Sequence, residues 1–357
     1  MALWMSSNTR KIKAVVVDDS NFMVTVLKDI LESDGRVEVI GTGKDGREAI
    51  ELNKKMDPDV ILIDIQMEGM DGLTAVENIM SEDPTPMVVI SGLGDEAGKM
   101  SVKALEAGAV DFISKTSGSL SMDIRKKSDA IVDKLVNAAK TDPSLFFEEK
   151  QISKGKKYSP SVTEDWIIAV ASSTGGTRAL DEFLSCLPPN FHVPIIVVQH
   201  MPKDFTGHLA STLDSKLDIP IKEAKDREII KNNQVYIIPS GLHGFIDSDG
   251  GKKIIRLKSG PKKHGVKPAA DHLFRSASEK YGERVFGVVF TGMGEDGAEG
   301  ADHIRDKNGL IALQDEKTSV VYGMPKSAKE KAGSDFEGSP SDIGKKVLDM
   351  FMEEKNE

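Results

Sequence analysis

The 357-residue sequence has one cysteine, 5% aromatic residues and no apolar run near the ~20 residues that span a bilayer. Cys186 alone excludes an intrachain disulfide, and seven histidines without short paired spacing give no credible zinc site. The net charge of −10 argues against general nucleic-acid binding, because polyanions are repelled. The opening MALWMSSNTRKIK is too short and polar for a signal peptide. We expect a cytoplasmic protein that inserts into no membrane and acts as a monomer.

What the sequence does contain is a first block in which short apolar runs alternate with helical patterns. The runs are continuous rather than interleaved with polar residues, which is typical of strands buried on both faces of a parallel sheet. These predicted strands cover residues 13–18, 37–41, 60–64, 87–91 and 110–114. Five βα units of this size predict a doubly wound (βα)5 domain over residues 11–140.

A linker and a second α/β domain follow. Residues 141–164 mix Pro, Ser, Lys and Glu without periodicity, which is typical of a linker. Over residues 165–354 we expect a second doubly wound, mainly parallel domain, with an antiparallel hairpin at GFIDSDGGKKIIRLK, where a D-G-G turn separates two short runs. Its predicted parallel strands cover residues 166–171, 193–199, 234–239, 284–291 and 309–314.

Polar residues gather at the carboxyl ends of the first domain's strands, where ligands bind in open parallel sheets. Asp18 and Asp19 follow the first strand, Asp64 ends the third, Ser91 the fourth, and Lys115 follows the fifth. Three carboxylates at one edge repel one another unless a hard cation joins them, and Mg²⁺ suits oxygen ligands. Lysine and serine supply donors to a phosphoryl group, so the pattern predicts an aspartate that is phosphorylated.

The stretches VVVDDS, ILIDIQMEGMDGL, VVIS and DFISK resemble the response-regulator receiver family. The resemblance implies phosphorylation at Asp64 by a histidine kinase. The sequence departs from the family's pattern at Glu68 and Thr116, where proline is usual. The resemblance assigns the remaining roles as follows: Mg²⁺ ligation to Asp19, Asp64, the carbonyl of Gln66 and, through water, Asp18; and the conformational switch to Ser91, Lys115 and Phe112.

Strand ends of the second domain offer a nucleophile, a base and an acid. The loop ASSTGGT contains Ser172 and Ser173, and a serine there is a helix cap, a phosphate ligand or a nucleophile, with capping favoured for Ser172. His200 ends the next strand and shares the sheet edge with Ser173, as a general base requires. The acid that orients it comes from TGMGEDG, but spacing alone does not choose between Glu295 and Asp296.

The same TGMGEDG loop also matches G-x-G-x-x-G, the dinucleotide fingerprint, with Asp315 about 20 residues beyond the first glycine. Two acids would then face a pyrophosphate, which is unfavourable. A receiver-regulated dinucleotide-binding protein is therefore the first alternative to an enzyme with a serine nucleophile. A scaffold whose second domain only binds receptors is the other.

The stretches ASSTGGT, VVQHMPKDFT, TGMGEDGAEG and VVYGMP resemble the CheB methylesterase family, in which a receiver precedes the catalytic domain. The resemblance implies Ser173 as nucleophile, His200 as base and Asp296 as orienting acid, with Thr174 and the backbone of Met293 near the oxyanion. It implies demethylation of glutamate γ-methyl esters on methyl-accepting chemotaxis receptors, with deamidation of glutamines. The phosphodonor is then the chemotaxis histidine kinase, and the esterase reaction needs no cofactor.

Overall fold

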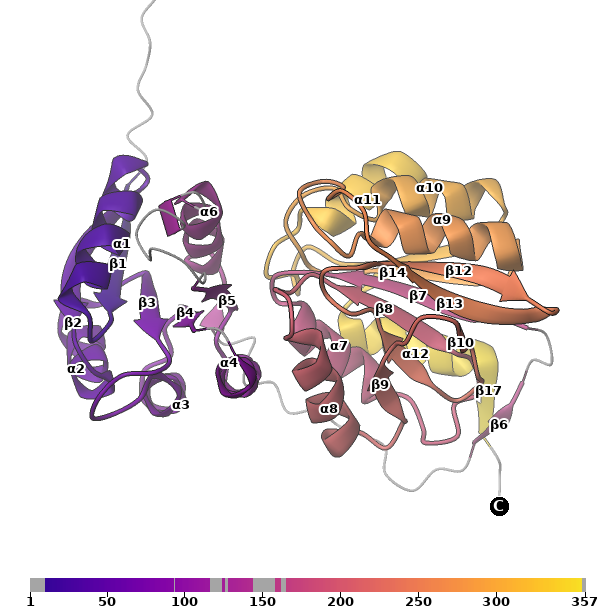
Figure 1. The fold of residues 1–357 in the computed structure, drawn as a ribbon, viewed down its shortest axis with the longest axis horizontal. Coiled ribbons are helices and arrows are strands. Elements are labelled where there is room, and N and C mark those ends of the chain that lie inside the picture. Colours follow the sequence, from indigo (N-terminus) through magenta and orange to yellow (C-terminus); the bar gives the residue numbers. More distant parts are fainter. Residues whose placement is uncertain are drawn as a thin grey trace, which may run out of the picture. The chain divides into compact units, whose positions relative to one another are not determined.

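The computed structural model describes residues 10–92, 94–115, 124–125, 128–143, 158–161 and 165–354. The chain divides into two compact units, Met1–Phe146 and Phe147–Glu357 (Figure 1). The predicted linker, residues 141–164, spans this division. Among the described residues no helix is both long and apolar enough to cross a membrane.

The first unit is a parallel five-stranded sheet of order β2-β1-β3-β4-β5, with α1 and α6 on one face and α2, α3 and α4 on the other. Its strands are β1 (Ile12–Val17), β2 (Val37–Gly43), β3 (Val60–Asp64), β4 (Met87–Ser91) and β5 (Asp111–Ser114). Its helices are α1 (Asn21–Ser33), α2 (Gly46–Met56), α3 (Gly72–Glu82), α4 (Asp95–Glu106) and α6 (Ser128–Ala138). The predicted (βα)5 fold is confirmed.

Local signals explain these elements. Every residue of β3 and β4 is buried, as continuous apolar runs predict for strands covered on both faces. The helices α1, α2 and α3 begin where Ser20, Asp45 and Asp71 accept hydrogen bonds from first-turn N–H groups. Each such cap contributes about 1 kcal/mol to helix stability. The caps therefore fix where α1, α2 and α3 begin, and so limit the loops that connect β1, β2 and β3 to these helices.

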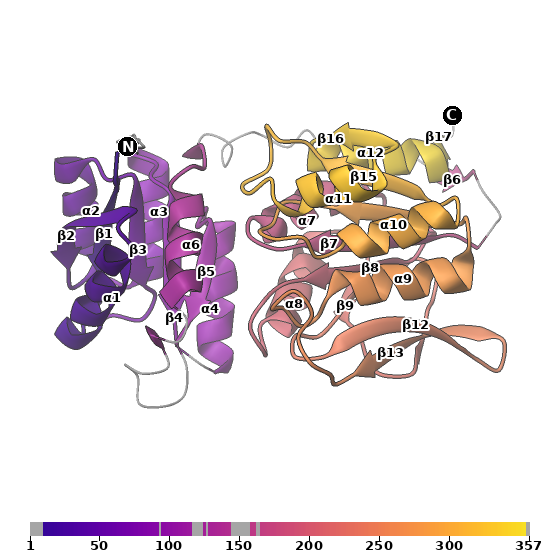
Figure 2. The same ribbon diagram turned by 90° about the horizontal axis from the view of Figure 1, so that it is seen from above.

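The second unit is built on a parallel seven-stranded sheet of order β16-β15-β14-β7-β8-β11-β9. Helices α9, α10 and α11 cover one face of it, and α7, α8 and α12 cover the other (Figures 1 and 2). The strands are β7 (Ile167–Ser172), β8 (Ile195–Gln199), β9 (Ile221–Glu223), β11 (Val235–Ile237), β14 (Val285–Val289), β15 (Leu310–Gln314) and β16 (Phe336–Gly338). The helices are α7 (Gly176–Leu184), α8 (Thr206–Lys216), α9 (Ala270–Tyr281), α10 (Ala298–Asp306), α11 (Met324–Ala332) and α12 (Pro340–Phe351).

Antiparallel strands complete the unit. The predicted hairpin is confirmed as β12 (His243–Asp249) and β13 (Lys252–Lys258), joined on its edge by β10 (Glu228–Ile229). A small pair also forms between β6 (Tyr158–Pro160) and β17 (Met352–Glu354), so part of the predicted linker is a strand of this unit. The helix α12 and the strands of two or three residues other than β11 were not predicted, whereas β11 lies within the predicted strand 234–239. The capping box formed by Ser339 and Asp342 at the start of α12 was readable in the sequence.

The order of the second sheet reverses between β7 and β14. From β7 the chain proceeds outward through β8, and β14 begins the other half of the sheet. Ligands bind at such a reversal, outside the carboxyl ends of the strands. Ser173 follows β7, His200 follows β8 and Asp296 lies in the loop after β14, so all three sit at this edge.

Candidate active site

An acidic pocket lies at the strand ends of the first unit. One carboxylate oxygen from each of Asp18, Asp19 and Asp64 lies within 4.8 Å of the others. Asp18 and Asp64 are 0% and 3% exposed, so their repulsion is little screened by water. The Lys115 ammonium lies 2.5 Å from Asp64 Oδ2 and 3.2 Å from Asp18 Oδ2. The structure thus brings together the three acids and the lysine expected from the sequence.

The charges of this pocket are only partly balanced. Burial raises the pKa of Asp64, Asp18 adds to the rise, and Lys115 opposes it without cancelling it. Burial works against the charge on Lys115, but the two carboxylates hold its pKa above the ordinary value. Three converging oxygen donors with unbalanced negative charge fit a hard divalent cation such as Mg²⁺, for which Asp18, Asp19 and Asp64 are suitable ligands.

The other predicted receiver residues surround the pocket. The Ser91 hydroxyl donates to the carbonyl of Ala97 at 3.1 Å, and Phe112 is 3% exposed. The N–H of Gln66 donates to Asp64 Oδ1 at 3.4 Å, so Gln66 lies beside the pocket. The N–H of Glu68 donates to Asp19 at 3.3 Å, a contact that proline could not make. Thr116 lies outside the described residues.

The two candidate serines of the second unit, Ser172 and Ser173, differ in burial and in hydrogen bonding. Ser172 is fully buried, and its hydroxyl donates to Gln199 Oε1 at 2.6 Å. Ser173 is half-buried, and its hydroxyl has no hydrogen bond within the described part of the chain. The expected capping role of Ser172 is wrong, since its hydroxyl bonds a neighbouring strand end instead. Of these two serines, Ser173 is the one that solvent reaches.

Gln199, which sequence reasoning missed, joins two of the site's loops. Its side-chain amide donates to the carbonyl of Ser173 at 2.9 Å and to that of His200 at 3.2 Å. Its oxygen accepts from Ser172, so one buried side chain ties the end of β7 to the end of β8. Its place one residue before His200, at the end of the same strand, was the available signal.

His200 and Asp296 form a direct pair. His200 Nε2 donates to Asp296 Oδ2 at 2.8 Å, and the side chains are 8% and 2% exposed. Burial favours the neutral acid, but the His200 bond and the N–H groups of Ala270 and Asp271 lower the pKa of Asp296 below its ordinary value. His200 Nδ1 is buried without a hydrogen-bond partner among the described residues. The pair therefore leaves one imidazole nitrogen without a hydrogen bond among the described residues.

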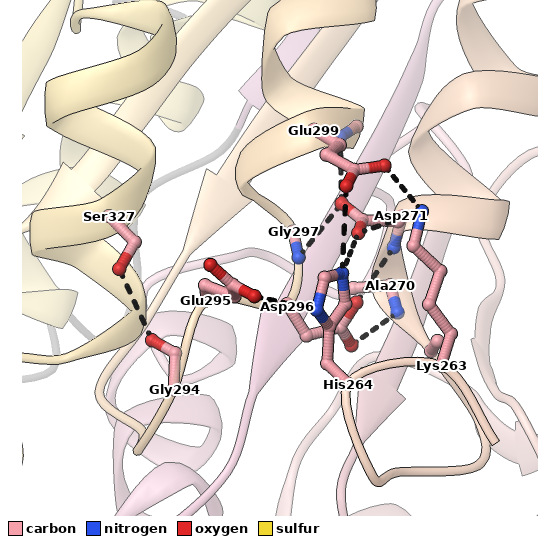
Figure 3. A network of polar contacts seen from close by, with 12 residues as sticks. Lys263, His264, Ala270, Asp271, Gly294, Glu295, Asp296, Gly297, Glu299 and Ser327 are labelled. Atoms are coloured by element: carbon pink, nitrogen blue, oxygen red, sulfur yellow. Dashed lines mark hydrogen bonds and ion pairs between the residues drawn. The ribbon is translucent and has the colours of Figure 1, made fainter.

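The geometry decides between the two acids of TGMGEDG. The Glu295 side chain is 68% exposed and pairs with His264 at 3.0 Å, away from His200. The N-terminus of α10, where a dinucleotide phosphate would bind, is filled by the carboxylate of Asp271. Asp271 Oδ1 accepts the N–H of Gly297 at 3.0 Å (Figure 3). It also accepts the N–H of Gly300 at 2.7 Å. The glycines of the loop therefore deliver an acid and leave no free anion site.

The two expected oxyanion residues are Thr174, which follows Ser173 in the chain, and Met293, in the loop after β14. Thr174 is 7% exposed, and its carbonyl accepts the hydroxyl of Thr291 at 3.0 Å. Met293 is 44% exposed, and the preceding Gly292 packs directly on Ser173. A Cβ atom at Gly292 would lie 2.7 Å from Ser173 Cβ, closer than packing allows. The loop before Met293 is thus pressed against the serine.

A (βα)5 unit with an acidic pocket, joined to an α/β unit with a buried His–Asp pair beside an accessible serine, defines a response regulator with an enzymatic output domain. The CheB methylesterase family model matches residues 168–347, and the response regulator receiver domain model matches residues 14–123. The chain therefore belongs to the CheB methylesterase family and carries a receiver domain before its catalytic domain.

Relatives and a solved structure agree with this assignment. A protein of Pyrococcus abyssi named protein-glutamate methylesterase/protein-glutamine glutaminase is 44% identical over 92% of this chain and 90% of its own length. One of the same name from Thermotoga maritima is 39% identical over 96% of this chain and 99% of its own. The crystal structure of the Thermotoga maritima CheB methylesterase catalytic domain is 39% identical, covers 53% of this chain and all of that one, and aligns with a TM-score of 0.52.

Proposed function

We propose that this chain is a phosphorylation-activated protein-glutamate methylesterase of bacterial chemotaxis. Its substrates are glutamate γ-methyl esters on methyl-accepting receptors, whose demethylation gives sensory adaptation. The observation that carries the proposal is the buried His200–Asp296 pair, at 2.8 Å, beside the accessible Ser173. A chain of the CheB methylesterase family with this arrangement is equipped for acyl transfer.

In the first half of the reaction Ser173 Oγ attacks the γ-carbonyl carbon of the ester. The hydroxyl proton passes to His200 Nδ1, and Asp296 stabilises the imidazolium through Nε2. The tetrahedral intermediate then breaks its bond to the methoxy oxygen, which takes the proton from His200 and leaves as methanol. An acyl-enzyme on Ser173 remains.

Water completes the reaction from the same side. His200 removes a proton from the water that attacks the acyl carbon, and returns a proton to Ser173 Oγ as the glutamate carboxylate leaves. A glutamine side chain follows the same path, with ammonia leaving in place of methanol. The names of the relatives, which include protein-glutamine glutaminase, support this second activity.

The oxyanion is assigned to the neighbourhood of Thr174 and the backbone of Met293. Gly292 supports this assignment, because its close packing on Ser173 brings the loop that carries Met293 beside the nucleophile. The loop is held at its back, where the Gly292 carbonyl accepts the N–H of Met324 at 2.8 Å. Donors held in place before the reaction stabilise an oxyanion by about 3–4 kcal/mol each.

The receiver regulates this chemistry through Asp64. A carboxylate oxygen of Asp64 attacks the phosphoryl group of the phosphodonor, the chemotaxis histidine kinase, and the donor's bond to phosphorus breaks. Lys115 binds the incoming phosphoryl oxygens, while Ser91 and Phe112 respond to the new charge. Asp18, Asp19, Asp64 and Gln66 would hold Mg²⁺, which neutralises charge on the transferred group when bound.

Methanol release from methylated receptor membranes tests the proposal, with and without a low-molecular-weight phosphodonor. We expect Ser173→Ala to abolish release. Ser172→Ala is the matched control, since it removes a neighbouring hydroxyl that only bonds Gln199, and we expect it to keep most of the activity. Full activity of Ser173→Ala would remove Ser173 as the nucleophile. A wild-type chain that binds these membranes but releases no methanol would be a scaffold instead.

A further inference from the structure

The loop that carries Asp296 and the helix α9 hold each other by exchanged caps. Asp296 stands before α10, yet its carboxylate accepts the first N–H groups of α9, from Ala270 at 2.6 Å and from Asp271 at 3.2 Å. In return Asp271, in the first turn of α9, accepts the N–H groups of Gly297 and Gly300 at the start of α10. Each aspartate thus caps the other's helix.

The loop's other contacts lie beside Asp296 rather than on it: the Ser327 hydroxyl donates to the Gly294 carbonyl at 3.3 Å, and His264 pairs with Glu295 at 3.0 Å. Gly297 is the N-cap of α10 and has no side chain to offer, and both Gly294 and Gly297 have positive φ values, of 91° and 93°. Between them Glu295 is largely exposed. Glycines in this region are conformationally free, so the loop's own sequence does not hold Asp296 at 2.8 Å from His200.

The charge of Asp271 is itself balanced. Its second oxygen, Oδ2, lies 2.9 Å from His264 Nε2 and 3.2 Å from Lys263 Nζ (Figure 3). Lys263 also pairs with Glu299 at 2.6 Å, and despite its partial burial these two carboxylates raise its pKa. Lys263 therefore supplies a cation to this cluster, beside the carboxylate of Asp271, which is 2% exposed.

We propose that Asp271 is a positioning residue for the hydrolytic reaction. By accepting the N–H groups of Gly297 and Gly300 it fixes the loop that places Asp296 against His200. The inference rests on the proposed roles of Ser173, His200 and Asp296. Removal of the acceptor would leave two N–H groups of α10 unpaired and release the loop, and a misplacement of about 1 Å at a catalytic group can cost about 100-fold in rate.

Three substitutions at Asp271 separate geometry from charge. Asp271→Asn keeps an oxygen that can accept both N–H bonds, Asp271→Glu keeps the charge but moves the oxygen one methylene away, and Asp271→Ala removes the acceptor. In the phosphorylated full-length chain we expect kcat for methanol release to fall about 10- to 100-fold in Asp271→Ala. The fall should be intermediate in Asp271→Glu and smallest in Asp271→Asn, and KM should change less than about twofold in all three variants.

Glu299→Gln is the matched control. It removes a partner of Lys263 without touching Gly297 or Gly300, so we expect kcat within about twofold of the wild type. The pH profile of kcat/KM distinguishes positioning from mere loss of fold. When Asp296 no longer faces His200, the acidic limb shifts to lower pH in Asp271→Ala and stays in place in Asp271→Asn. A variant that only has a smaller folded fraction would show lower activity, with the acidic limb of its kcat/KM profile at the same pH as in the wild type.

Two results would overturn the inference. One is wild-type kcat with an unmoved acidic limb in Asp271→Ala. The other is an inverted ranking, in which Glu is active and Asn is not, because charge rather than the loop contacts would then be what matters. If Asp271→Ala does not fold, the comparison of Asn with Glu decides alone. Retained activity in Ser173→Ala would instead refute the proposed function, so the two failures are distinguishable.

Discussion

Two buried aspartates, one in each unit, respond to burial in opposite ways. Asp64 and Asp296 are 3% and 2% exposed, and burial alone raises the pKa of both. Asp296 receives His200 and two backbone N–H groups, which together lower its pKa. Asp64 has Lys115 and one long N–H contact, with Asp18 nearby, and its pKa stays raised. The difference in donors, not in burial, decides the sign.

The comparison teaches what each site is suited to do. The His200 bond and two fixed backbone donors stabilise the charge of Asp296, which is appropriate for holding one imidazole in place. A single flexible lysine and neighbouring carboxylates leave Asp64 under-compensated, so its energy changes strongly when a cation or a phosphoryl group arrives. One site is preorganised, and the other is ready to change state.

The largest expected effect concerns the site that changes state. Asp64→Asn removes the carboxylate that we propose accepts the phosphoryl group, so incorporation of labelled phosphate from a phosphodonor should fall to background. Methanol release should remain at the level of the unphosphorylated chain and gain nothing when the donor is added. Asp29→Asn, at an exposed acid of the same unit, is the control. Label retained by Asp64→Asn would place the phosphorylation site elsewhere.

The fixed site is tested by Asp296→Asn. The substitution keeps the size of the side chain but removes the charge that stabilises the imidazolium, and it offers an N–H where His200 donates. We expect kcat to fall by about 10³- to 10⁴-fold, with phosphorylation of the receiver unchanged. Glu295→Gln, at the neighbouring exposed acid, should stay near wild type. Equal losses in the two variants would contradict the assignment of Asp296.

A smaller effect is expected from the packing that supports the fixed site. In Gly292→Ala the new methyl group overlaps the buried Met324 Sδ and lies 2.7 Å from Ser173 Cβ, so Met324, the serine or the loop before Met293 must move. We expect kcat to fall about 10-fold or more, and the temperature of thermal unfolding to fall as well, because the overlap with Met324 overpacks the core. In Gly207→Ala the methyl group makes only ordinary contact with Glu223, at 3.6 Å, and activity should be retained.

The smallest effect is the most direct test of the opposite pKa shifts. The lowered pKa of Asp296 means that its charge stabilises the fold above the ordinary value of 3.8, and that this contribution is lost as pH falls through the lower folded value. The raised pKa of Asp64 has the opposite effect on how stability depends on pH. Its contribution is complete below 3.8 and is lost as pH rises through the higher folded value.

Calorimetry at a series of acidic pH values, without divalent cations, measures the stability contributions of both Asp296 and Asp64. As pH rises, Asp296→Asn should lose stability relative to the wild type in the transition of the second unit, whereas Asp64→Asn should gain it in that of the first. Each variant identifies its own transition by moving only that one. If the stability difference from the wild type changed with pH in the same direction in both variants, the backbone donors and Lys115 would not act as described.

Sequence reasoning reached much of the fold and the candidate site. Continuous apolar runs predicted both parallel sheets, and the residues that follow β1, β3, β7 and β8 predicted which polar groups share an edge. It missed β9, β10 and β16, because strands of two or three residues carry almost no periodicity. It also assigned a cap to Ser172, since a serine before a helix usually caps it, and nothing local announces that Gln199 takes its hydroxyl.

By itself the sequence determined that Ser173, His200 and the TGMGEDG loop meet, because parallel strands necessarily bring their carboxyl ends to one edge. Only the tertiary structure decided which serine is accessible, and that Asp296 rather than Glu295 faces His200. It also made Asp271 the anion at the start of α10. The first outcome depends on the bond from Ser172 to Gln199, 27 positions away. The other two depend on the packing of α9 against α10, which joins residues 25 to 29 positions apart through single hydrogen bonds. Local pattern cannot encode contacts of that kind, since their formation depends on where two helices come to rest.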